Sequence, residues 1–447
     1  MAANATQDQE LPVLIIGAGS CGLAIANGLK NAGIPYKVFE KDLSVKLRDD
    51  KKSRDWAIAC HWSSPTLAEL LGEAKWSRIT EAQVDPNTPT PDLDIAKMFN
   101  GATGEIMTTL PFPKFYRFLR SRLRALMAED LDIVYGKKLV SLSYHNNNTT
   151  TTTTTDGTNA SPYAVAHFED GTEARGRLVI AADGSNSKVR SLLLGAETAK
   201  PKRLPLAATF INASFTREQA LFLRSYHPLI NVIAHPDNML GMLAMLDAPD
   251  PARPEDWRFC FYISGQTPVE QQDAESAVMG VRERLAQAKE RSRAFADPLK
   301  SAHEWLPDDL ETVYWTSNAN WDPSLKEHEW DNHGGLVTLA GDAAHPMTYH
   351  RGQGLNHALD DAGKLVKLLV DPSGRSQAEV VDVYEAEMRE RAGGEVQLSE
   401  MNSFMLHDWN KLFHSPFMKR GLTKGSGEAE GAPAEAGETA APAGTSA

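Results

Sequence analysis

The start of the chain shows an apolar run, a helical pattern and a second apolar run. Leu11 to Ile16 is rich in β-branched residues and stops at a glycine loop, which is typical of a buried parallel strand. The segment from Leu23 to Gly33 has helical periodicity and ends at a glycine that suits a helix C-terminus. Tyr36 to Phe39 then predicts a strand that ends at Glu40. This order predicts a β-α-β unit.

The middle of the chain predicts a small sheet and a mixed insertion. Leu139 to Tyr144 and Tyr163 to Phe168 are strand-like and flank the polar tract Asn146 to Thr155, which predicts a loop tip. Residues 203–330 alternate strand-like pieces with a polar helix over Ala274 to Arg293, a mixture that suits a domain covering a substrate. Further strand-like pieces are Leu178 to Ala182, Leu206 to Phe215, Leu240 to Leu246 and Trp257 to Ser264.

The last third of the chain combines a strand, a glycine-rich segment and an amphipathic helix. Leu336 to Leu339 predicts a strand that runs into the segment Gly341 to Gly354. The helix after it carries one apolar stripe, which predicts that it packs on a core. The residues of this stripe are Leu355, Leu359, Ala362, Val366 and Leu369.

Composition and charge narrow the class of protein. The 447 residues carry a formal net charge of −13, which argues against non-specific binding to nucleic acid or to an anionic membrane. The three cysteines are an odd number and no leader-like segment precedes them, so we expect a reducing, cytoplasmic compartment. No apolar run is long enough to cross a bilayer, and we expect no transmembrane segment. A small-molecule substrate fits these features best, and the oligomeric state is open.

The glycine loop of the β-α-β unit predicts a dinucleotide site. Gly17 permits the tight turn, Gly19 lets a diphosphate approach the backbone, and Gly22 lets the helix pack close to the strand. The helix N-terminus then presents unpaired N–H groups and a positive dipole end to the diphosphate. Glu40 is placed to accept hydrogen bonds from the adenosine ribose. The loop alone does not distinguish NAD from FAD.

Three later segments resemble those of a known family. The string Leu339 to Pro346, followed by Arg351 to Asn356, closely resembles the GD signature of group A flavoprotein monooxygenases of the para-hydroxybenzoate hydroxylase fold. Ala182 to Arg190 is similar to the DG motif of that family. Arg54 to Trp62 resembles a segment of fungal FAD-dependent monooxygenases that act on phenolic secondary metabolites. The resemblance implies an α/β fold with a Rossmann-type FAD-binding domain and an inserted mixed-sheet substrate domain.

The implied FAD-binding domain is discontinuous. It comprises residues 11–75, 105–202 and 331–400. The substrate domain comprises residues 76–104 and 203–330, and residues 401–424 form a C-terminal helical segment. Residues 1–10 and the tail 425–447 have the composition of disordered segments.

The late glycine-rich segment predicts contacts with the flavin. The Asp342 carboxylate follows a buried strand, where it either accepts a hydrogen bond from a ribityl hydroxyl or caps a helix. Gly352 and Gly354 either let backbone N–H groups approach the flavin ring or form a plain turn between strand and helix. The helix that begins there, with Leu355 and Asn356 in its first turn, is expected to stabilise negative charge on the reduced flavin.

The resemblance implies further contacts with FAD. Arg120 matches the arginine that lies across the FAD in the family, and Leu139 places backbone near the adenine. Asp183 connects the flavin site with handling of the reductant, although a turn aspartate is the alternative. Arg120 equally suits a solvated helix face. Arg54 either contacts the diphosphate or ribityl region or pairs with Asp55 at the surface.

The resemblance also implies the reaction. NADH or NADPH reduces FAD, O₂ adds to give a C4a-hydroperoxide, and one oxygen atom enters an aromatic or phenolic, polyketide-like small molecule. Removing the phenol proton raises the nucleophilicity of the ring, and the candidates for this proton transfer are His61, Tyr349 and His350. Pro346 is expected to set its loop against the reactive face of the flavin. No second dinucleotide motif is present, so the nicotinamide is expected to bind transiently over the flavin cleft.

Other chemistries compete with this interpretation. The sequence contains no HExxH, no CxxC pair and no GxSxG motif, which argues against a metal site and against a nucleophilic triad. The WxWxIP signature of flavin halogenases is also absent from the sequence. A Baeyer-Villiger oxygenase, a reductase of the same fold and a flavin-binding carrier without turnover stay open as alternatives.

Overall fold

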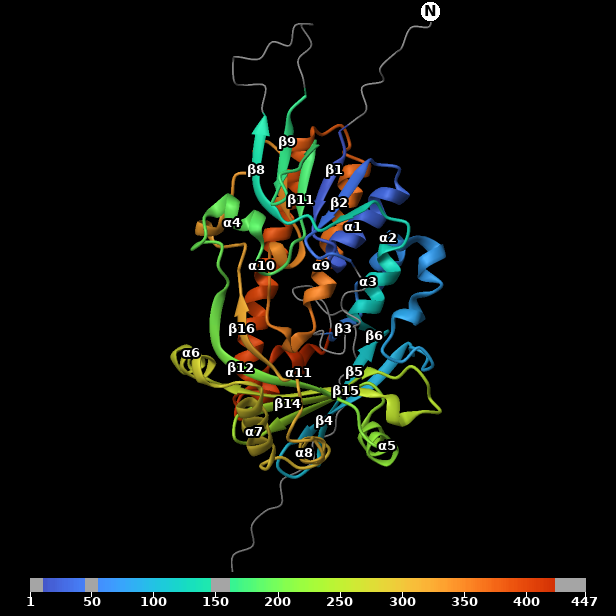
Figure 1. Ribbon diagram of the computed structural model, residues 1–447, viewed down its shortest axis with the longest axis vertical. Helices are drawn as coiled ribbons and strands as arrows, with labels where there is room; N and C mark the ends of the chain where they lie inside the picture. Colours follow the sequence, from blue (N-terminus) through green and yellow to red (C-terminus); the bar gives the residue numbers. More distant parts are fainter. Residues whose placement is uncertain (1–10, 45–54, 146–160, 423–447) are drawn as a thin grey trace, which may run out of the picture.

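The computed structural model describes residues 11–44, 55–145 and 161–422. Two large sheets lie at opposite ends of the molecule, and the helices α9 (Gly354–Val370) and α10 (Gln377–Leu406) run between them (Figure 1). The predictions for residues 1–10, the tract Asn146 to Thr155, Arg54 and the tail 425–447 lie outside the described residues.

A parallel five-stranded sheet forms one end of the molecule, with the strand order β17-β11-β1-β2-β7. Every residue of β1 and β11 is buried, because helices pack on one face of the sheet and the strands of a second, smaller sheet pack on the other, and the apolar runs predicted here need cover on both sides. The helix α1 (Ser20–Asn31) connects β1 to the parallel strand β2, which confirms the predicted β-α-β unit. The strands are β1 (Val13–Ile16), β2 (Tyr36–Glu40), β7 (Ile133–Tyr135), β11 (Leu178–Ala181) and β17 (Val337–Leu339).

A small antiparallel sheet lies against this parallel sheet, with the order β10-β9-β8. Its strands are β8 (Leu139–His145), β9 (Tyr163–Phe168) and β10 (Glu173–Gly176). The strand-like patterns at Leu139 and Tyr163 are confirmed, and the polypeptide then enters β11 of the parallel sheet.

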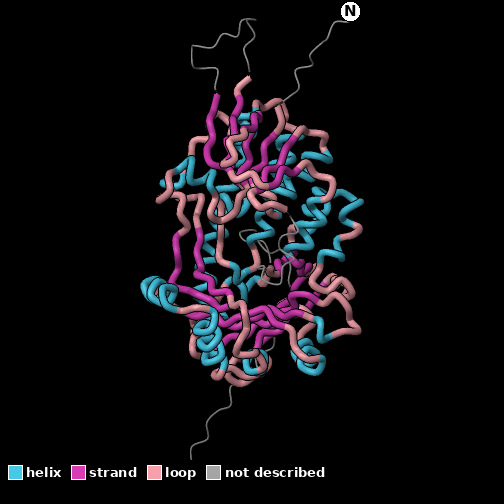
Figure 2. The backbone as a smooth tube through the Cα atoms, viewed as in Figure 1, coloured by secondary structure: helices cyan, strands magenta, loops and turns pink. Residues whose placement is uncertain are grey.

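A seven-stranded mixed sheet forms the other end of the molecule (Figure 2). Its order is β16-β12-β15-β14-β13-β4-β5, and the pairs are antiparallel except for β13 with β4. Its strands are β4 (Leu93–Asn100), β5 (Ile106–Pro113), β12 (Lys202–Ala213), β13 (Ile230–His235), β14 (Met239–Asp247), β15 (Arg258–Gln266) and β16 (Tyr314–Asn320). The helices around it are α5 (Arg217–Tyr226), α6 (Val269–Val278), α7 (Val281–Ser292) and α8 (Leu299–Glu304).

The single helix predicted over Ala274 to Arg293 is wrong, because the structure has two helices there. Gly280 separates α6 from α7, and its N–H donates a hydrogen bond to Glu283 Oε2 at 2.9 Å. Glycine is a poor residue for a helix interior, and the acidic side chain in the first turn of α7 favours a new helix start. The helical periodicity of the sequence continues across Gly280, so it does not reveal the break between the two helices.

Shorter elements connect the two ends of the molecule. They are β3 (Ala57–Cys60), α2 (Ser64–Trp76), β6 (Tyr116–Leu119), α3 (Arg120–Ala128), α4 (Lys188–Leu194) and α11 (Pro416–Arg420). β3 and β6 form a two-stranded ribbon. The predicted α/β fold, a Rossmann-type sheet with an inserted mixed sheet, is confirmed, while the domain boundaries stay a prediction. Within the described ranges, no helix has both the length and the apolar composition required to span a bilayer.

Candidate functional site

The loop between β1 and α1 is shaped by its glycines. Gly17 has a φ of +106°, and a Cβ atom there would lie 2.5 Å from the Ala182 carbonyl oxygen. A Cβ atom on Gly22 would lie 2.1 Å from the Gly17 carbonyl oxygen, so α1 could not keep its place against the loop. Gly19 differs, since the nearest atom to its Cβ position is the Ala182 carbonyl oxygen at 3.8 Å. The fold therefore leaves space at Gly19, beside the N-terminus of α1, where an anion is stabilised.

Glu40 ends β2 beside this loop and is held on both carboxylate oxygens. Oε2 accepts a hydrogen bond from Ala18 N at 2.8 Å, and Oε1 accepts one from Asp42 N at 3.0 Å. Arg124 Nη2 lies 3.9 Å from Glu40 Oε2, and Arg124 Nε donates to Ala18 O at 2.9 Å. Arg124 therefore fixes both the loop and the acidic residue. The sequence shows only a cluster of arginines on α3, so this role was not predicted.

Asp342 lies in the short 3-10 helix η5 (Gly341–Ala343), directly after β17. The residue is exposed to a cavity that it lines, and its carboxylate accepts no hydrogen bond from the described residues. The surrounding protein raises the pKa of Asp342, while His345, Arg120 and Arg190 oppose that rise. An acceptor that faces the cavity and lacks a donor fits the hydroxyl-rich ribityl chain of a flavin.

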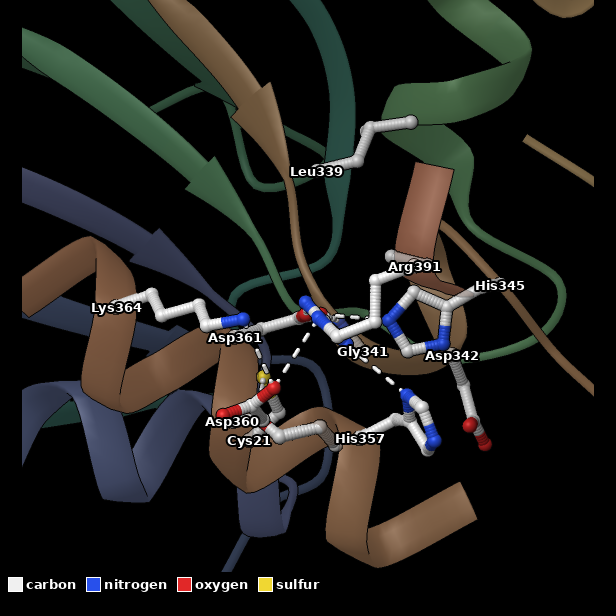
Figure 3. A network of polar contacts seen from close by, with 12 residues as sticks. Cys21, Leu339, Gly341, Asp342, His345, His357, Asp360, Asp361, Lys364 and Arg391 are labelled. Carbon is white, nitrogen blue, oxygen red and sulfur yellow. Dashed lines mark hydrogen bonds and ion pairs between the residues drawn. The ribbon is translucent and has the colours of Figure 1, made fainter. Parts of the chain in front are cut away.

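A network of polar contacts holds the Asp342 loop in place (Figure 3). Asp361 Oδ2, from α9, accepts a hydrogen bond from Gly341 N at 2.7 Å and lies 2.6 Å from His345 Nε2. Asp361 Oδ1 accepts a hydrogen bond from Arg391 Nη2, on α10, at 2.6 Å. Burial raises the pKa of Asp361, but His345 and Arg391 outweigh this effect and hold the pKa well below its usual range. The Asp342 side chain points away from the network (Figure 3).

Asp183 caps the helix α4 with one of its carboxylate oxygens. Oδ2 accepts hydrogen bonds from Lys188 N at 2.7 Å and from Val189 N at 3.3 Å. The other oxygen, Oδ1, is buried without a partner in the described structure, and burial raises the pKa of Asp183. The contacts of Oδ2 are those expected of a turn aspartate, the alternative given for Asp183 above. Oδ1 stays available to a bound group.

Arg190 connects the DG and GD segments. Its Nη2 donates to Ser185 O at 2.5 Å, and its Nη1 donates to Ala343 O at 2.7 Å. The guanidinium also lies over the Trp321 ring, 4.8 Å from its centroid. The sequence places Arg190 within the DG motif, but its contact with a loop more than a hundred residues away was not predicted.

The start of α9 supplies the other residues predicted to contact the flavin. Gly352 has a φ of +62°, and the Cβ position of Gly354 lies 4.0 Å from Asp342 Oδ1. Gly352, Gly354 and Leu355 line the cavity together with Asp342. The N–H groups of the first helical turn have no intrahelical acceptor, so the helix presents its positive end at this edge of the cavity.

The Asn356 side chain connects α9 to the end of β3. Its Oδ1 accepts hydrogen bonds from His61 N at 3.0 Å and from Ser63 Oγ at 2.8 Å. Its Nδ2 donates to Gly352 O at 3.0 Å and lies 2.9 Å from His61 Nε2. The amide is therefore used within the protein, and only the backbone of Asn356 is left for a cofactor.

His61 and Pro346 do not line the cavity, and their roles in catalysis stay predictions. His61 is buried against Asn356, and burial lowers its pKa to about 4. Pro346 is buried, and its carbonyl oxygen accepts a hydrogen bond from Trp321 N at 3.0 Å. Their contacts give both residues a structural position behind the loop.

Arg120 and Leu139 lie at different distances from the cavity. Arg120 begins α3, its guanidinium lies 4.4 Å from the centroid of the Trp56 ring, and its charge reaches Asp342. Leu139 begins β8 and is buried opposite Phe168 on β9, away from the cavity lining. The structure thus places Arg120 where its charge acts on Asp342, and Leu139 in the three-stranded sheet, and their contacts with FAD stay predictions.

The cavity measures about 400 Å³ and lies between the start of α9 and the seven-stranded sheet. Aromatic rings form much of its wall, and the Phe210 ring lies 4.6 Å from the Tyr262 ring and 5.5 Å from the Tyr349 ring. The predicted residues Tyr349 and His350 do line the cavity. Among the described residues, no three His, Cys, Asp or Glu side chains are grouped as metal ligands.

Tyr349 and His350 are both neutral near pH 7. Burial raises the pKa of Tyr349 well above its usual value, and Asn318 lies beside its hydroxyl. Burial, together with the nearby His407, lowers the pKa of His350 well below its usual value. His350 Nδ1 lies 2.9 Å from Ser403 Oγ. Neither side chain is a strong base at neutral pH, and both can form hydrogen bonds with a ligand.

Comparison with known proteins identifies the family. The profile of the FAD binding domain family matches residues 133–399. The chain belongs to the FAD-dependent monooxygenases. It is 35% identical to the FAD-dependent monooxygenase cctM of Talaromyces islandicus, over 93% of this chain and 97% of that protein. It is 33% identical to the FAD-dependent monooxygenase phnB of Penicillium herquei, over 92% of this chain and 94% of that protein. The family expected from the sequence motifs is confirmed.

Solved structures share the fold of this chain. Klebsiella pneumoniae HpxO, complexed with FAD and uric acid, matches with a TM-score of 0.65 and 20% identity, over 94% of this chain and 95% of that one. The 2,6-dihydroxypyridine-3-hydroxylase of Arthrobacter nicotinovorans matches with a TM-score of 0.65 and 17% identity, over 90% of this chain and 94% of that one. The predicted para-hydroxybenzoate hydroxylase-like architecture is therefore confirmed at the level of the fold.

Proposed function

We propose that this FAD-dependent monooxygenase uses NADH or NADPH and O₂ to insert one oxygen atom into an aromatic or phenolic small molecule of polyketide type. The observation that carries the proposal is the cavity, where Asp342 and the start of α9 lie opposite aromatic rings. When bound, FAD supplies the chemistry that side chains lack, since it takes a hydride from the nicotinamide and activates O₂.

The residues of the chain hold the cofactor at several points. The space at Gly19 suits the diphosphate, and the carboxylate of Glu40 lies at the end of β2, where an adenosine ribose would bind. Asp342 offers an acceptor to the ribityl chain, and the N-terminus of α9 offers a positive dipole end to the flavin ring. Arg120 adds a positive charge on the same side of the cavity.

The same cavity is suited to a planar substrate. The rings of Phe210, Tyr262 and Tyr349 can stack on an aromatic compound. Tyr349 stays protonated at neutral pH because burial raises its pKa, so we assign it a hydrogen bond to a substrate oxygen. His350 can accept or donate one further hydrogen bond at the cavity. We place the protein in the cytoplasm, where the free and buried Cys21, Cys60 and Cys260 would stay reduced.

The test uses the purified protein with its bound flavin, NADH or NADPH, and a panel of phenolic polyketides under ¹⁸O₂. We expect consumption of O₂ that depends on the phenol, and a product that is heavier by one ¹⁸O atom. Saturation of a double bond without uptake of O₂ would instead show a reductase, and an oxygen inserted beside a ketone would show a Baeyer-Villiger oxygenase. Absence of flavin reduction with every compound would support a carrier.

A further inference from the structure

Arg117 is a buried cation that has no carboxylate partner among the described residues, and it lies in the wall of the cavity. Its side chain comes from the middle of β6 and lines the cavity, with the residue 5% exposed. Its Nε donates a hydrogen bond to Met245 O, on β14, at 3.1 Å. In the described part of the chain, no carboxylate forms an ion pair with Arg117. Burial lowers the pKa of Arg117 to about 10, so the guanidinium is still charged at neutral pH.

Most of the other arginines with little exposure in the described residues have acidic partners, and the exception, Arg190, donates hydrogen bonds to the carbonyl oxygens of Ser185, Ala199 and Ala343. Arg351 pairs with Glu395, and Arg391 pairs with Asp361 at 2.6 Å. Arg284 pairs with Glu275 at 2.7 Å. A guanidinium without such a partner destabilises a folded protein, because it loses its hydration shell and gains only a hydrogen bond to a carbonyl group.

The remaining charged groups of the cavity wall do not compensate Arg117. The Asp55 carboxylate accepts hydrogen bonds from Ser121 Oγ at 2.5 Å and from Trp56 N at 3.0 Å. Asp342 lies across the cavity, at the end of β17, on the side assigned to the flavin. The groups whose electrostatic influence reaches Arg117 are the Cys260 thiol and the Tyr262 hydroxyl, and burial raises the pKa of Tyr262 well above its usual value.

We propose that Arg117 binds a negatively charged oxygen of the substrate, so that the enzyme selects aromatic compounds that enter the cavity as phenolates, enolates or carboxylates. The inference rests on the proposed function, because it assumes that this cavity is the substrate site. The aromatic rings beside Arg117 favour a planar compound, and the guanidinium favours an anionic oxygen at its edge. For a phenolate, the negative charge also makes the ring more nucleophilic toward an electrophilic oxygen.

The experiment compares matched pairs of ligands that differ in charge and little in shape. One pair is 2-naphthoate and 2-naphthamide, and the other is 2,4-dinitro-1-naphthol, which is ionised at neutral pH, and its methyl ether. Calorimetric titration of the FAD-loaded wild type gives a dissociation constant for each compound without any turnover. We expect the anionic member of at least one pair to bind more tightly, and the pair that shows this distinguishes a carboxylate from a phenolate.

The variant Arg117→Met removes the charge and keeps an unbranched apolar side chain. We expect the preferred anion to lose at least about thirtyfold in affinity, while its neutral partner changes by less than about threefold. Arg117→Lys should recover part of the preference. The control Arg203→Met removes an arginine from β12 that pairs with Asp273 at 2.6 Å, and it should leave all affinities unchanged.

Several outcomes would overturn the inference. The first is a wild type without preference for an anion in either pair, and the second is an equal loss of affinity for the charged and the neutral compound in Arg117→Met. A third is weaker FAD binding in this variant, because it would make the cofactor the partner of Arg117. Thermal unfolding of Arg117→Met distinguishes a structural role of Arg117 from a role in ligand binding. Removal of an unpaired buried charge should not lower the melting temperature, so a lower value would indicate a structural role. Anion preference without oxygenation of any compound would contradict the proposed function alone.

Discussion

Gly19 and Gly22 lie in the same loop but have different reasons to be glycine. A side chain on Gly22 would meet the Gly17 carbonyl oxygen at 2.1 Å, so the fold itself requires the glycine. A side chain on Gly19 would meet no protein atom closer than 3.8 Å, so the fold does not. Gly22 is therefore explained by packing of the fold and Gly19 by binding of a ligand, and alanine substitutions at the two positions can test this difference.

Gly19→Ala should weaken FAD binding by at least about tenfold, because the new methyl group enters the space that we assign to the diphosphate. The apoprotein should lose less than about 1 kcal/mol of stability, the usual difference between glycine and alanine at a helix N-cap. Fluorescence titration with FAD and urea unfolding of the apoprotein provide the two numbers. Gly22→Ala should instead destabilise the apoprotein, and Gly394→Ala, on α10 with nothing within 4 Å, serves as the control. Equal FAD affinity in Gly19→Ala would refute the assignment.

Asp342→Ala tests the cofactor contact at the other end of the flavin. We expect a loss of at least about tenfold in FAD affinity, because the carboxylate that faces the cavity is the proposed acceptor for a ribityl hydroxyl. The apoprotein should be as stable as the wild type or more stable, since the carboxylate receives no hydrogen bond from the described residues. The same two titrations measure both effects. A destabilised apoprotein that binds FAD normally would show that Asp342 has only a structural role.

At the scale of elements, the network of polar contacts between α9 and α10, formed by Asp361 and Arg391, positions the Asp342 loop. Asp361 receives hydrogen bonds from the loop and from Arg391, so one carboxylate holds three segments together. Its depressed pKa shows that the charged form is the one that the fold stabilises. The residues lie on helices that the sequence separates, and only the fold brings them into contact.

Asp361→Asn should destabilise the protein by about 1.5–3 kcal/mol at pH 7, because it removes the charged acceptor that faces Arg391 and His345, while Arg391 keeps its ion pairs with Glu387 and Asp360. The folded-state pKa of Asp361 is lowered, so its contribution is complete above about pH 4, the value for an unfolded aspartate, and is lost as the pH falls through the folded-state value. The difference between variant and wild type should therefore be constant from pH 7 to pH 5 and shrink in stronger acid. Urea unfolding across this range checks it, with the exposed Glu390→Gln as control. A difference that grows in acid would contradict the assigned charge.

Local patterns explain which elements the sequence predicts. β1, α1, β2, β11 and α9 each carry a continuous apolar run or stripe, so their type and position follow from the chain itself. The contacts of the site do not follow in the same way. Arg124, Arg190 and Arg117 stand among many arginines, and only tertiary structure shows which carbonyl group or carboxylate each one reaches. His61 lies in a segment that resembles the family, but only the fold shows that its side chain contacts Asn356.

At the scale of the whole molecule, the cavity is assembled from segments that are far apart in the sequence. Asp55 and Trp56, the strands β12 and β15, the start of α9 and the helix α11 all contribute to its wall. The C-terminal part closes it, since Phe417 on α11 is 4% exposed and its backbone N–H donates to Asn402 Oδ1 on α10 at 2.8 Å. The Phe417 ring also lies 6.4 Å from the Phe112 ring of β5. This closure matters because monooxygenation requires that water be kept from the activated oxygen.

Phe417→Leu should therefore loosen the coupling between consumption of NAD(P)H and formation of product. The smaller side chain leaves space in the cavity wall through which water can enter, at a stability cost of roughly 1–1.5 kcal/mol, which the fold should tolerate. We expect more H₂O₂ for each NAD(P)H oxidised, measured by a peroxidase assay beside product quantification, with FAD content unchanged. Phe413→Leu is the matched control, because Phe413 is 51% exposed four residues earlier. If both variants release the same H₂O₂ as the wild type, the C-terminal helix does not seal the cavity, and its contact with Asn402 only anchors the end of the described chain.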